Sequence, residues 1–288
     1  MHSPASEHLP DVRVRRNRAQ GPWPARSASI RLLDADPDLG AGLDPARFEA
    51  ARARLVVRRL VPRASAWSDG ALERVSSEGL GLIILKGILA REIALSDNVT
   101  TELVGAGDLI RPSHTEEPRR LLRASVRWTV IEAPELAVLG PAAESVLAEF
   151  PEIYAVLVDR LAGRAHRVSV AQAISQLNGV DRRVLTLFWH LAERWGRISG
   201  EGVVVPLAVP HRIVAQLVGA RRPTVSTALG ALVREGRLTR LPDGGWLLRG
   251  EPVGFPVGEA SRVIRMRRRH FAPGVSHHTA EVGSSLSG

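Results

Sequence analysis

The stretch from Val209 to Leu229, VPHRIVAQLVGARRPTVSTAL, predicts two short helices around a tight turn. Gly219 suits a residue that leaves the first helix through the left-handed region, and Pro223 suits the first turn of the second. The first helix has apolar residues at the spacing of one buried face, namely Ile213, Val214, Leu217 and Val218. The second carries a matching stripe of Val225, Ala228, Leu229 and Leu232. This pattern predicts a helix-turn-helix, a unit whose second helix enters the major groove of DNA.

The residues that follow predict a small β-hairpin. Leu238–Leu241 and Trp246–Leu248 have the composition of short strands, and Asp243-Gly244-Gly245 between them is a strong signal for a hairpin turn. A helix-turn-helix followed by such a hairpin is a winged helix. The alternative interpretation is an ordinary helical hairpin packed into a core, but the ordered combination of turn, paired arginines and wing favours DNA binding.

The charge of the chain is consistent with an anionic partner. The formal net charge is +9 at pH 7, and the isoelectric point is about 11.3. Between Val203 and Gly250, seven arginines stand against two acidic residues. A surface of this kind takes most of its affinity from DNA phosphates, and that part of the affinity weakens steeply with salt.

Several classes of protein are excluded or disfavoured. The sequence contains no cysteine, which excludes disulfides and thiolate iron–sulfur clusters. No apolar run approaches the ~20 residues needed to cross a bilayer, and the first residues lack the apolar core of a signal peptide. We therefore expect a cytoplasmic protein with no membrane partner. We also expect no enzyme, metal site or cofactor, because His190 with Glu193 is too small a set of ligands for zinc and no glycine-rich dinucleotide loop is complete.

Composition predicts non-globular segments at both ends of the chain. Residues 1–29 are rich in Arg, Pro and Ser without periodicity and predict a basic flexible arm. Residues 251–288 hold the basic run Arg265–His270 and a Gly/Ser-rich end, and they predict a basic, largely disordered tail. Contact with DNA phosphates and simple solvation are equally open interpretations of both segments.

Residues 30–150 predict a domain rich in strands. They begin with a helix that has Asp44 as its expected N-cap and Pro45 in its first turn. Short β-rich runs then recur at residues 81–89, 100–110, 124–133 and 135–139, which is typical of a sandwich or barrel. A short helix over residues 141–149 follows.

The next part of the chain predicts helices. Residues 151–178 predict one long helix with a narrow apolar seam, which suits pairing with a second copy of the chain. Residues 182–195 predict a further amphipathic helix, which leads into the winged helix and completes a domain over residues 179–250.

This order of elements, with the run DRRVLTLFWHLAERWG from Asp181 to Gly196, resembles the Crp/Fnr family of bacterial transcription factors. The resemblance covers about Ile30 to Gly250 and is strongest from Asp181 onward. It implies an α+β fold: an N-terminal β-roll of the double-stranded β-helix or jelly-roll type, a long dimerisation helix and a C-terminal winged helix-turn-helix. It also implies a homodimer that binds a palindromic site in double-stranded DNA, with RNA polymerase as a further candidate partner.

The resemblance assigns base-reading roles to the start of the second helix. Arg222 matches the arginine that reads guanine in the family. Pro223 stands where the best-known members have Glu, and it cannot accept a hydrogen bond from a cytosine amino group. Thr227 occupies a later position, often Arg, where it is expected to contact a thymine methyl or a phosphate. The other predicted DNA contacts are to the phosphate backbone: Thr224, Ser226, His211, Arg212, Arg221 and, in the wing, Arg240.

The nucleotide-binding cassette of the family is degenerate in this sequence. The turn Gly107-Asp108 is retained, but Pro112 stands where the ribose-binding Glu is expected. A buried phosphate needs converging donors, so an incomplete set forfeits most of the binding energy and we expect no tight binding of cyclic AMP or cyclic GMP. The ligand of this region, if it has one, stays open, and the residues in question are Gly107, Asp108, Arg111, Arg123 and Ser125.

The sequence therefore predicts a sequence-specific DNA-binding regulator of transcription that acts without cyclic-nucleotide control. The alternative is a nucleoid-associated or structural DNA-binding protein with little sequence specificity. A footprint at a defined palindrome distinguishes the first from the second.

Overall fold

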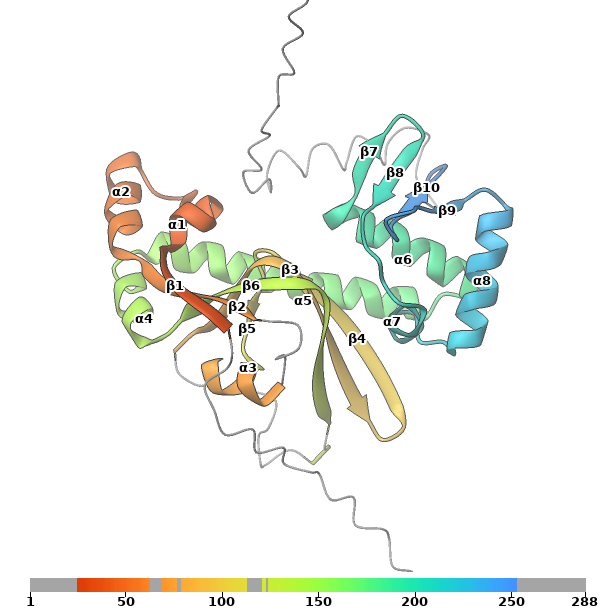
Figure 1. Ribbon diagram of the computed structural model, residues 1–288, viewed down its shortest axis with the longest axis horizontal. Helices are drawn as coiled ribbons and strands as arrows, with labels where there is room; N and C mark the ends of the chain where they lie inside the picture. The colour runs from red at the N-terminus through yellow and green to blue at the C-terminus, as the bar shows by residue number, and fades with distance from the viewer. Residues whose placement is uncertain (1–24, 63–68, 77–78, 113–120, 123, 253–288) are drawn as a thin grey trace, which may run out of the picture.

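The computed structural model describes residues 25–62, 69–76, 79–112, 121–122 and 124–252 (Figure 1). The fold combines helices with antiparallel sheets. A six-stranded sheet lies toward the N-terminus, a four-stranded sheet toward the C-terminus, and the long helix α5 (Pro151–Ser175) runs between the two regions.

The six-stranded sheet has the strand order β1-β2-β6-β3-β4, with β5 paired to β3. Its strands are β1 (Ala25–Arg31), β2 (Val56–Pro62), β3 (Gly81–Leu95), β4 (Asn98–Gly105), β5 (Leu109–Ile110) and β6 (Ser125–Leu139). The pairing of β3 with β6 shifts register around Gly87, which has φ +80°. A Cβ at Gly87 would lie 2.3 Å from the carbonyl oxygen of Ala133, so glycine permits this close approach.

Two expectations for these strands need correction. The run expected at residues 81–89 is the first part of one 15-residue strand, which continues through the bulge at Gly87 to Leu95, and the two strands expected at 124–133 and 135–139 are the single strand β6. The predicted arm over residues 1–29 also ends too late, because β1 begins at Ala25 and pairs along its length with β2. Residues 1–24 and 253–288, the rest of the predicted arm and nearly all of the predicted tail, lie outside the described residues.

Both faces of the six-stranded sheet are covered. On one face Ile83 packs with Leu32, Leu147 and Ile153, and on the other its neighbours Leu82 and Ile84 pack with Leu72. This alternation follows from the two-residue period of a strand. The covering helices are α1 (Leu32–Ala35), the 3-10 helix η1 (Pro37–Gly40), α2 (Pro45–Arg54), α3 (Asp69–Ser76) and α4 (Pro141–Leu147).

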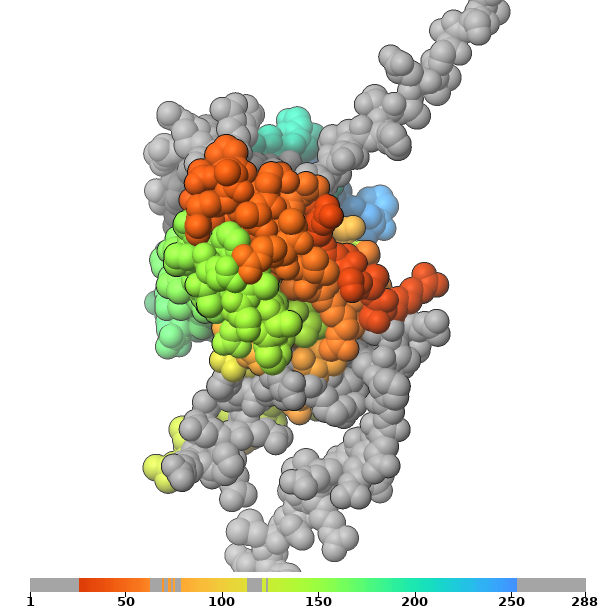
Figure 2. Space-filling view, turned by 90° about the vertical axis from the view of Figure 1, so that its left-hand side faces the viewer, coloured from red at the N-terminus to blue at the C-terminus, as the bar shows by residue number. Residues whose placement is uncertain are grey.

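The N-terminal helices pack beside α4 and the start of α5 (Figure 2). Helix α2 is capped as predicted, since Asp44 Oδ1 accepts from the backbone N–H of Arg47 at 2.9 Å. The side chain of Arg47 then donates to both carboxylate oxygens of Glu152, at 3.0 Å each. Arg160 of α5 pairs with Asp36 in the same way, at 2.5 and 2.8 Å.

The C-terminal region lies close to its predicted positions. Its elements are α6 (Val180–Trp195), β7 (Arg197–Ser199), β8 (Gly202–Val205), α7 (His211–Leu217), α8 (Arg222–Arg234), β9 (Leu238–Arg240) and β10 (Trp246–Leu248). The strands form a sheet in the order β7-β8-β10-β9. Phe188 of α6 is fully buried, and its ring centroid lies 5.2 Å from that of Trp246.

The two regions share apolar contacts. Ile88, Ala90 and Leu103 of the six-stranded sheet belong to the same buried cluster as the cores of α6, α7 and α8. The C-terminal helices are therefore packed on the sheet as well as joined to it through α5.

Candidate nucleic-acid interface

Helices α7 and α8 meet around a turn at Gly219. This residue has φ +62°, in the left-handed region that favours glycine, and the N–H of Ala220 returns to the carbonyl of Ala215 at 2.9 Å. Both apolar stripes predicted from the sequence are buried, and they are Ile213, Val214, Leu217 and Val218 with Val225, Ala228, Leu229 and Leu232. Their packing fixes the angle at which α8 leaves the turn.

The N-terminal end of α8 presents an exposed polar face. All the predicted contact residues of this segment are exposed: Arg221, Arg222, Pro223, Thr224, Ser226 and Thr227. Arg221 is the N-cap, and Pro223 lies in the first turn, where its missing N–H costs no hydrogen bond. The first turn of a helix carries unpaired N–H groups and the positive end of the helix dipole, so this face favours an anionic partner.

His211 lies beside this face. Its Nδ1 is 3.0 Å from Ser226 Oγ, which joins the start of α7 to the exposed side of α8. Burial, followed by the charges of Arg240 and Arg222, lowers the pKa of His211 below its ordinary value. The two arginines therefore act on the same imidazole from different elements. Thr227 Oγ1 donates to the carbonyl of Pro223 at 3.2 Å, which leaves its methyl group for other contacts.

Arg240 extends the basic surface onto the β9–β10 hairpin. Its guanidinium carbon lies 4.7 Å from the ring centroid of Trp246, a cation–π geometry. The turn of this hairpin is at the predicted place, with Gly244 at φ +85° and Asp243 Oδ1 accepting from the N–H of Gly245 at 2.8 Å.

Arg212 departs from the predicted arrangement. Its guanidinium donates to Glu92 of β3, at 2.5 Å to Oε2 and 3.3 Å to Oε1. The residue predicted to lie near the DNA backbone is thus directed toward the six-stranded sheet, because a buried carboxylate there offers it a charged acceptor. Of the predicted DNA contacts, those on α8 lie beside His211 and Arg240, while the guanidinium of Arg212 is paired with Glu92.

The described residues of the degenerate cassette lie in different surroundings. Gly107 has φ +85° in the β4–β5 turn, and Ser125 is the exposed first residue of β6. Asp108 is 3% exposed and ion-paired to Arg167 and Arg194, at 2.6 and 2.7 Å. Its two carboxylate oxygens therefore bind arginines of α5 and α6. Arg123 lies outside the described residues.

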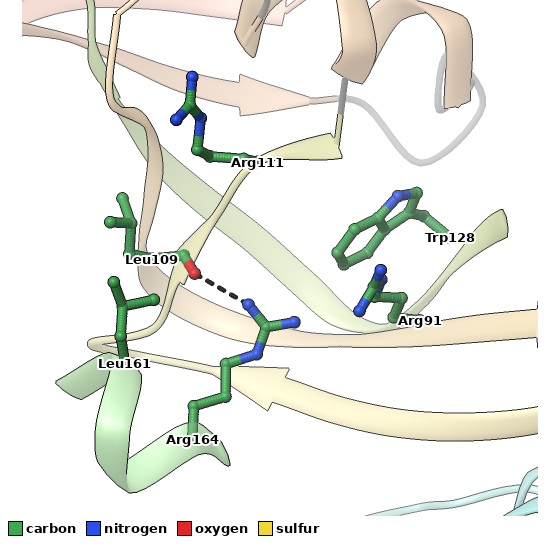
Figure 3. Close-up of a pocket in the computed structure, with 6 residues that line it drawn as sticks. All are labelled: Arg91, Leu109, Arg111, Trp128, Leu161 and Arg164. Atoms are coloured by element: carbon green, nitrogen blue, oxygen red, sulfur yellow. Dashed lines mark hydrogen bonds between the residues drawn. The ribbon is translucent and has the colours of Figure 1, made fainter. Parts of the chain in front are cut away.

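A cavity of about 200 Å³ lies between the sheet and α5 (Figure 3). Arg164 of α5 donates to the carbonyl of Leu109 at 3.0 Å and forms two hydrogen bonds to Glu102, at 2.6 and 2.8 Å. Figure 3 shows Arg91 next to the Trp128 ring, and Arg111 lies apart from these two residues. The lining residues in the described part of the chain are Arg91, Leu109, Arg111, Trp128, Leu161 and Arg164, and they include Arg111 of the predicted cassette.

Sequence reasoning missed the lining arginines Arg91 and Arg164 and the carboxylates Glu92 and Glu102. One signal was available: Arg91 and Glu92 are adjacent charges inside an apolar strand, a pattern that predicts buried ion pairs. Across the described residues, no group of three or more His, Cys, Asp or Glu is placed to hold a metal ion. In the same part of the chain, no helix is both long and apolar enough to cross a membrane.

The sequence is similar to curated bacterial regulators. It is 32% identical over 114 residues to the CRP-like cAMP-activated global transcriptional regulator of Mycobacterium tuberculosis, in both the H37Rv and CDC 1551 strains. The match covers 40% of this chain and 51% of the relative, so the chain spans about half the length of the curated relatives it matches. No family model matches the chain.

Solved structures with a related arrangement include a CooA mutant from Carboxydothermus hydrogenoformans and FixK2 from Bradyrhizobium japonicum. The first has a TM-score of 0.47 and 17% identity over 64% of this chain and 77% of its own. The second has a TM-score of 0.47 and 17% identity over 64% of this chain and 85% of its own. The chain is therefore similar in sequence to CRP-like transcriptional regulators over about half of their length.

Proposed function

We propose that this protein is a sequence-specific DNA-binding regulator of transcription. The observation that carries the proposal is the exposed N-terminal face of α8, held on a buried apolar base and flanked by His211 and Arg240. In this proposal α7, α8 and the β9–β10 hairpin act as a winged helix-turn-helix, and α8 enters the major groove.

Arg222 is the proposed base-reading residue. A guanidinium at the start of the helix has the fork geometry that matches the O6 and N7 acceptors of guanine. Pro223 offers no acceptor, so the neighbouring base is read differently from the pattern of the best-known family members. The proposed phosphate contacts are Arg221, Thr224, Ser226, His211 and Arg240, with Thr227 contacting a phosphate or a thymine methyl.

The proposed domain division follows from the same resemblance. Residues 30–150 form an effector-like β-roll, extended by the observed strand β1, and residues 151–178 form the dimerisation helix. Residues 179–250 form the DNA-binding domain, and double-stranded DNA with RNA polymerase are its proposed partners.

The proposed homodimer uses α5. Val158, Leu161 and Val168 of α5 are apolar but 60%, 43% and 44% exposed, whereas the buried residues of this helix are Ile153, Leu157 and Ile174. With the exposed Ala165 they follow a spacing of three and four residues, the seam of a two-helix coiled coil. Two copies aligned along this seam place two α8 helices for the two halves of a palindrome.

The double substitution Val158→Glu, Val168→Glu is expected to convert the dimer into a monomer, because it places like charges in the seam. Sedimentation velocity at micromolar concentration measures the change in mass. Val233→Glu adds charge at an exposed apolar residue of α8 and serves as the control that stays dimeric. A dimer that survives the double substitution contradicts the seam.

Cyclic AMP and cyclic GMP are expected to produce no binding heat at micromolar concentrations in titration calorimetry. Asp108 is ion-paired, Pro112 replaces the expected ribose acceptor, and the cavity of about 200 Å³ is smaller than a typical ligand site. The curated relative is named as cAMP-activated, so the proposal is that this chain differs from it in this respect. A micromolar dissociation constant for either nucleotide would overturn it.

The second candidate function is that of a nucleoid-associated protein with little sequence preference. The net charge of +9 favours it, because charge alone supports binding to any DNA. DNase footprinting on long DNA separates the two functions: protection of discrete two-fold sites supports the regulator, and uniform coating supports the alternative.

A further inference from the structure

Glu92 stands in an unusual position for a carboxylate. It lies inside β3, three residues before the strand ends at Leu95, and is 4% exposed. Thr129 of the neighbouring strand β6 donates to it, and from α7 it accepts bonds from Arg212 at 2.5 Å and from Gln216 at 3.2 Å. A buried charge is costly unless it is paired and hydrogen-bonded, and Glu92 meets both conditions only while α7 is in contact with the sheet.

Strand β4 adds a second connection to the same helix. Thr101 Oγ1 donates to Gln216 Oε1 at 2.9 Å. Arg212 and Gln216 are four residues apart, so they lie on one face of α7, and this face is turned to the β3–β4 hairpin. Beside these polar contacts, Ile88, Ala90 and Leu103 pack in the same apolar cluster as α7.

We propose that Glu92 is a positioning residue for DNA recognition, which holds α7 on the β3–β4 hairpin and thereby sets the orientation of α8. The inference rests on the proposed DNA-binding function. Helix α8 follows α7 rigidly because their apolar stripes are buried against each other. The hairpin contact leaves Arg222 and Thr224 exposed, so it fixes the reading face without covering it.

The energetic benefit lies in pre-organisation. A dimer that reads two half-sites requires its two α8 helices at one spacing and orientation. Ordering a loosely attached α8 at the moment of binding costs affinity, and a contact already made in the free protein removes that cost. Burial opposes the charged form of Glu92, but the bonds from Arg212, Thr129 and Gln216 outweigh it and lower the pKa of Glu92, so the carboxylate is ionised at neutral pH.

Glu92→Gln tests the proposal because loss of charge and loss of positioning are expected to change the affinity for DNA in opposite directions. Removing a negative charge from a DNA-binding protein is by itself expected to tighten binding. Loss of positioning is expected to weaken binding to the palindromic site by roughly tenfold, about the size of one charge-assisted hydrogen bond. Asp97→Asn, at an exposed residue at the tip of the same hairpin that accepts a bond from its neighbour Asn98, makes the same change of charge. Its affinity is expected to equal or exceed that of the wild type.

A double-mutant cycle is completed by Arg212→Gln and the double variant Glu92→Gln, Arg212→Gln. If Arg212 acts through Glu92, the double variant binds no more weakly than either single variant, and the dependence of affinity on salt keeps the wild-type slope. A slope reduced by about 1 in Arg212→Gln instead places this arginine on a phosphate and overturns the proposal.

Hydrogen exchange in the free protein supplies a readout that does not involve DNA. Faster exchange of the α7 amides in Glu92→Gln than in Asp97→Asn, with an unchanged circular dichroism spectrum, supports the role of Glu92 in holding α7 on the hairpin. This result stands even if the wild type fails to bind DNA, and in that case only the proposed function fails. Equal exchange and equal affinity of the two variants overturn the positioning role, as does tighter DNA binding by Glu92→Gln.

Discussion

Arg222→Ala is expected to abolish the preference of the protein for its target sequence while leaving residual, salt-sensitive binding to any DNA. Arg222 is exposed at the first turn of α8, where no ion pair within the described residues consumes its guanidinium. A bidentate contact between arginine and guanine contributes roughly 1–3 kcal/mol of discrimination at each half-site. The backbone contacts that remain carry no sequence information, so the residual affinity depends on salt alone.

Competition binding between a target and a scrambled duplex measures this loss. Arg234→Ala, at the last turn of the same helix, removes an equal charge from an exposed position and is the matched control. It is expected to weaken binding to both duplexes equally. An Arg222→Ala protein that still prefers the target as strongly as the wild type would refute the assignment.

Among single substitutions in the β4–β5 turn, Asp108→Ala is expected to cause the largest loss of stability. Asp108 is 3% exposed and accepts from the N–H of Gly105 at 2.9 Å, besides its pairs with Arg167 of α5 and Arg194 of α6. Removal of one partner from a buried ion pair leaves uncompensated charge. Because both arginines are partly exposed, we expect a loss of roughly 2–4 kcal/mol, somewhat below the full range for such a change.

Denaturation in urea measures this free energy of unfolding. Glu235→Ala removes an exposed carboxylate at the end of α8 and is expected to change it by less than about 0.5 kcal/mol. If Asp108→Ala matches this control, Asp108 does not join the turn to α5 and α6 in solution.

The C-terminal region could be predicted from the sequence because its signals are local. Gly219, Pro223 and the Asp243-Gly244-Gly245 turn each determine the backbone within a few residues, and the apolar stripes between them leave one arrangement of helices. Helices α7 and α8 and both strands of the hairpin accordingly form in the segments predicted for them, with α8 extending to Arg234.

The N-terminal sheet was harder to predict because strands depend on distant partners. Ala25–Arg31 has no strong pattern of its own and becomes a strand by pairing with Val56–Pro62. Gly87 signals a break, yet β3 passes through it because β6 follows the bulge. Strand β2 was not predicted for the same reason.

The ion pairs that join the two regions were beyond sequence reasoning. Glu92 and Arg212 are separated by 120 residues, and Asp108 and Arg194 by 86. Nothing in the local pattern of either partner identifies the other. The resemblance places Arg212 at the DNA backbone and Asp108 in a nucleotide cassette, and it gives no sign of the ion pairs that these residues form.

Selection of bound duplexes from a randomised DNA library, with the purified full-length protein, is the most direct test of sequence-specific recognition by a dimer. We predict enrichment of an inverted repeat whose half-sites lie about one helical turn apart, with a guanine in each half that Arg222→Ala no longer selects. A bound pool without any enriched motif, or with a single unrepeated one, would contradict recognition of a palindrome by a dimeric winged helix.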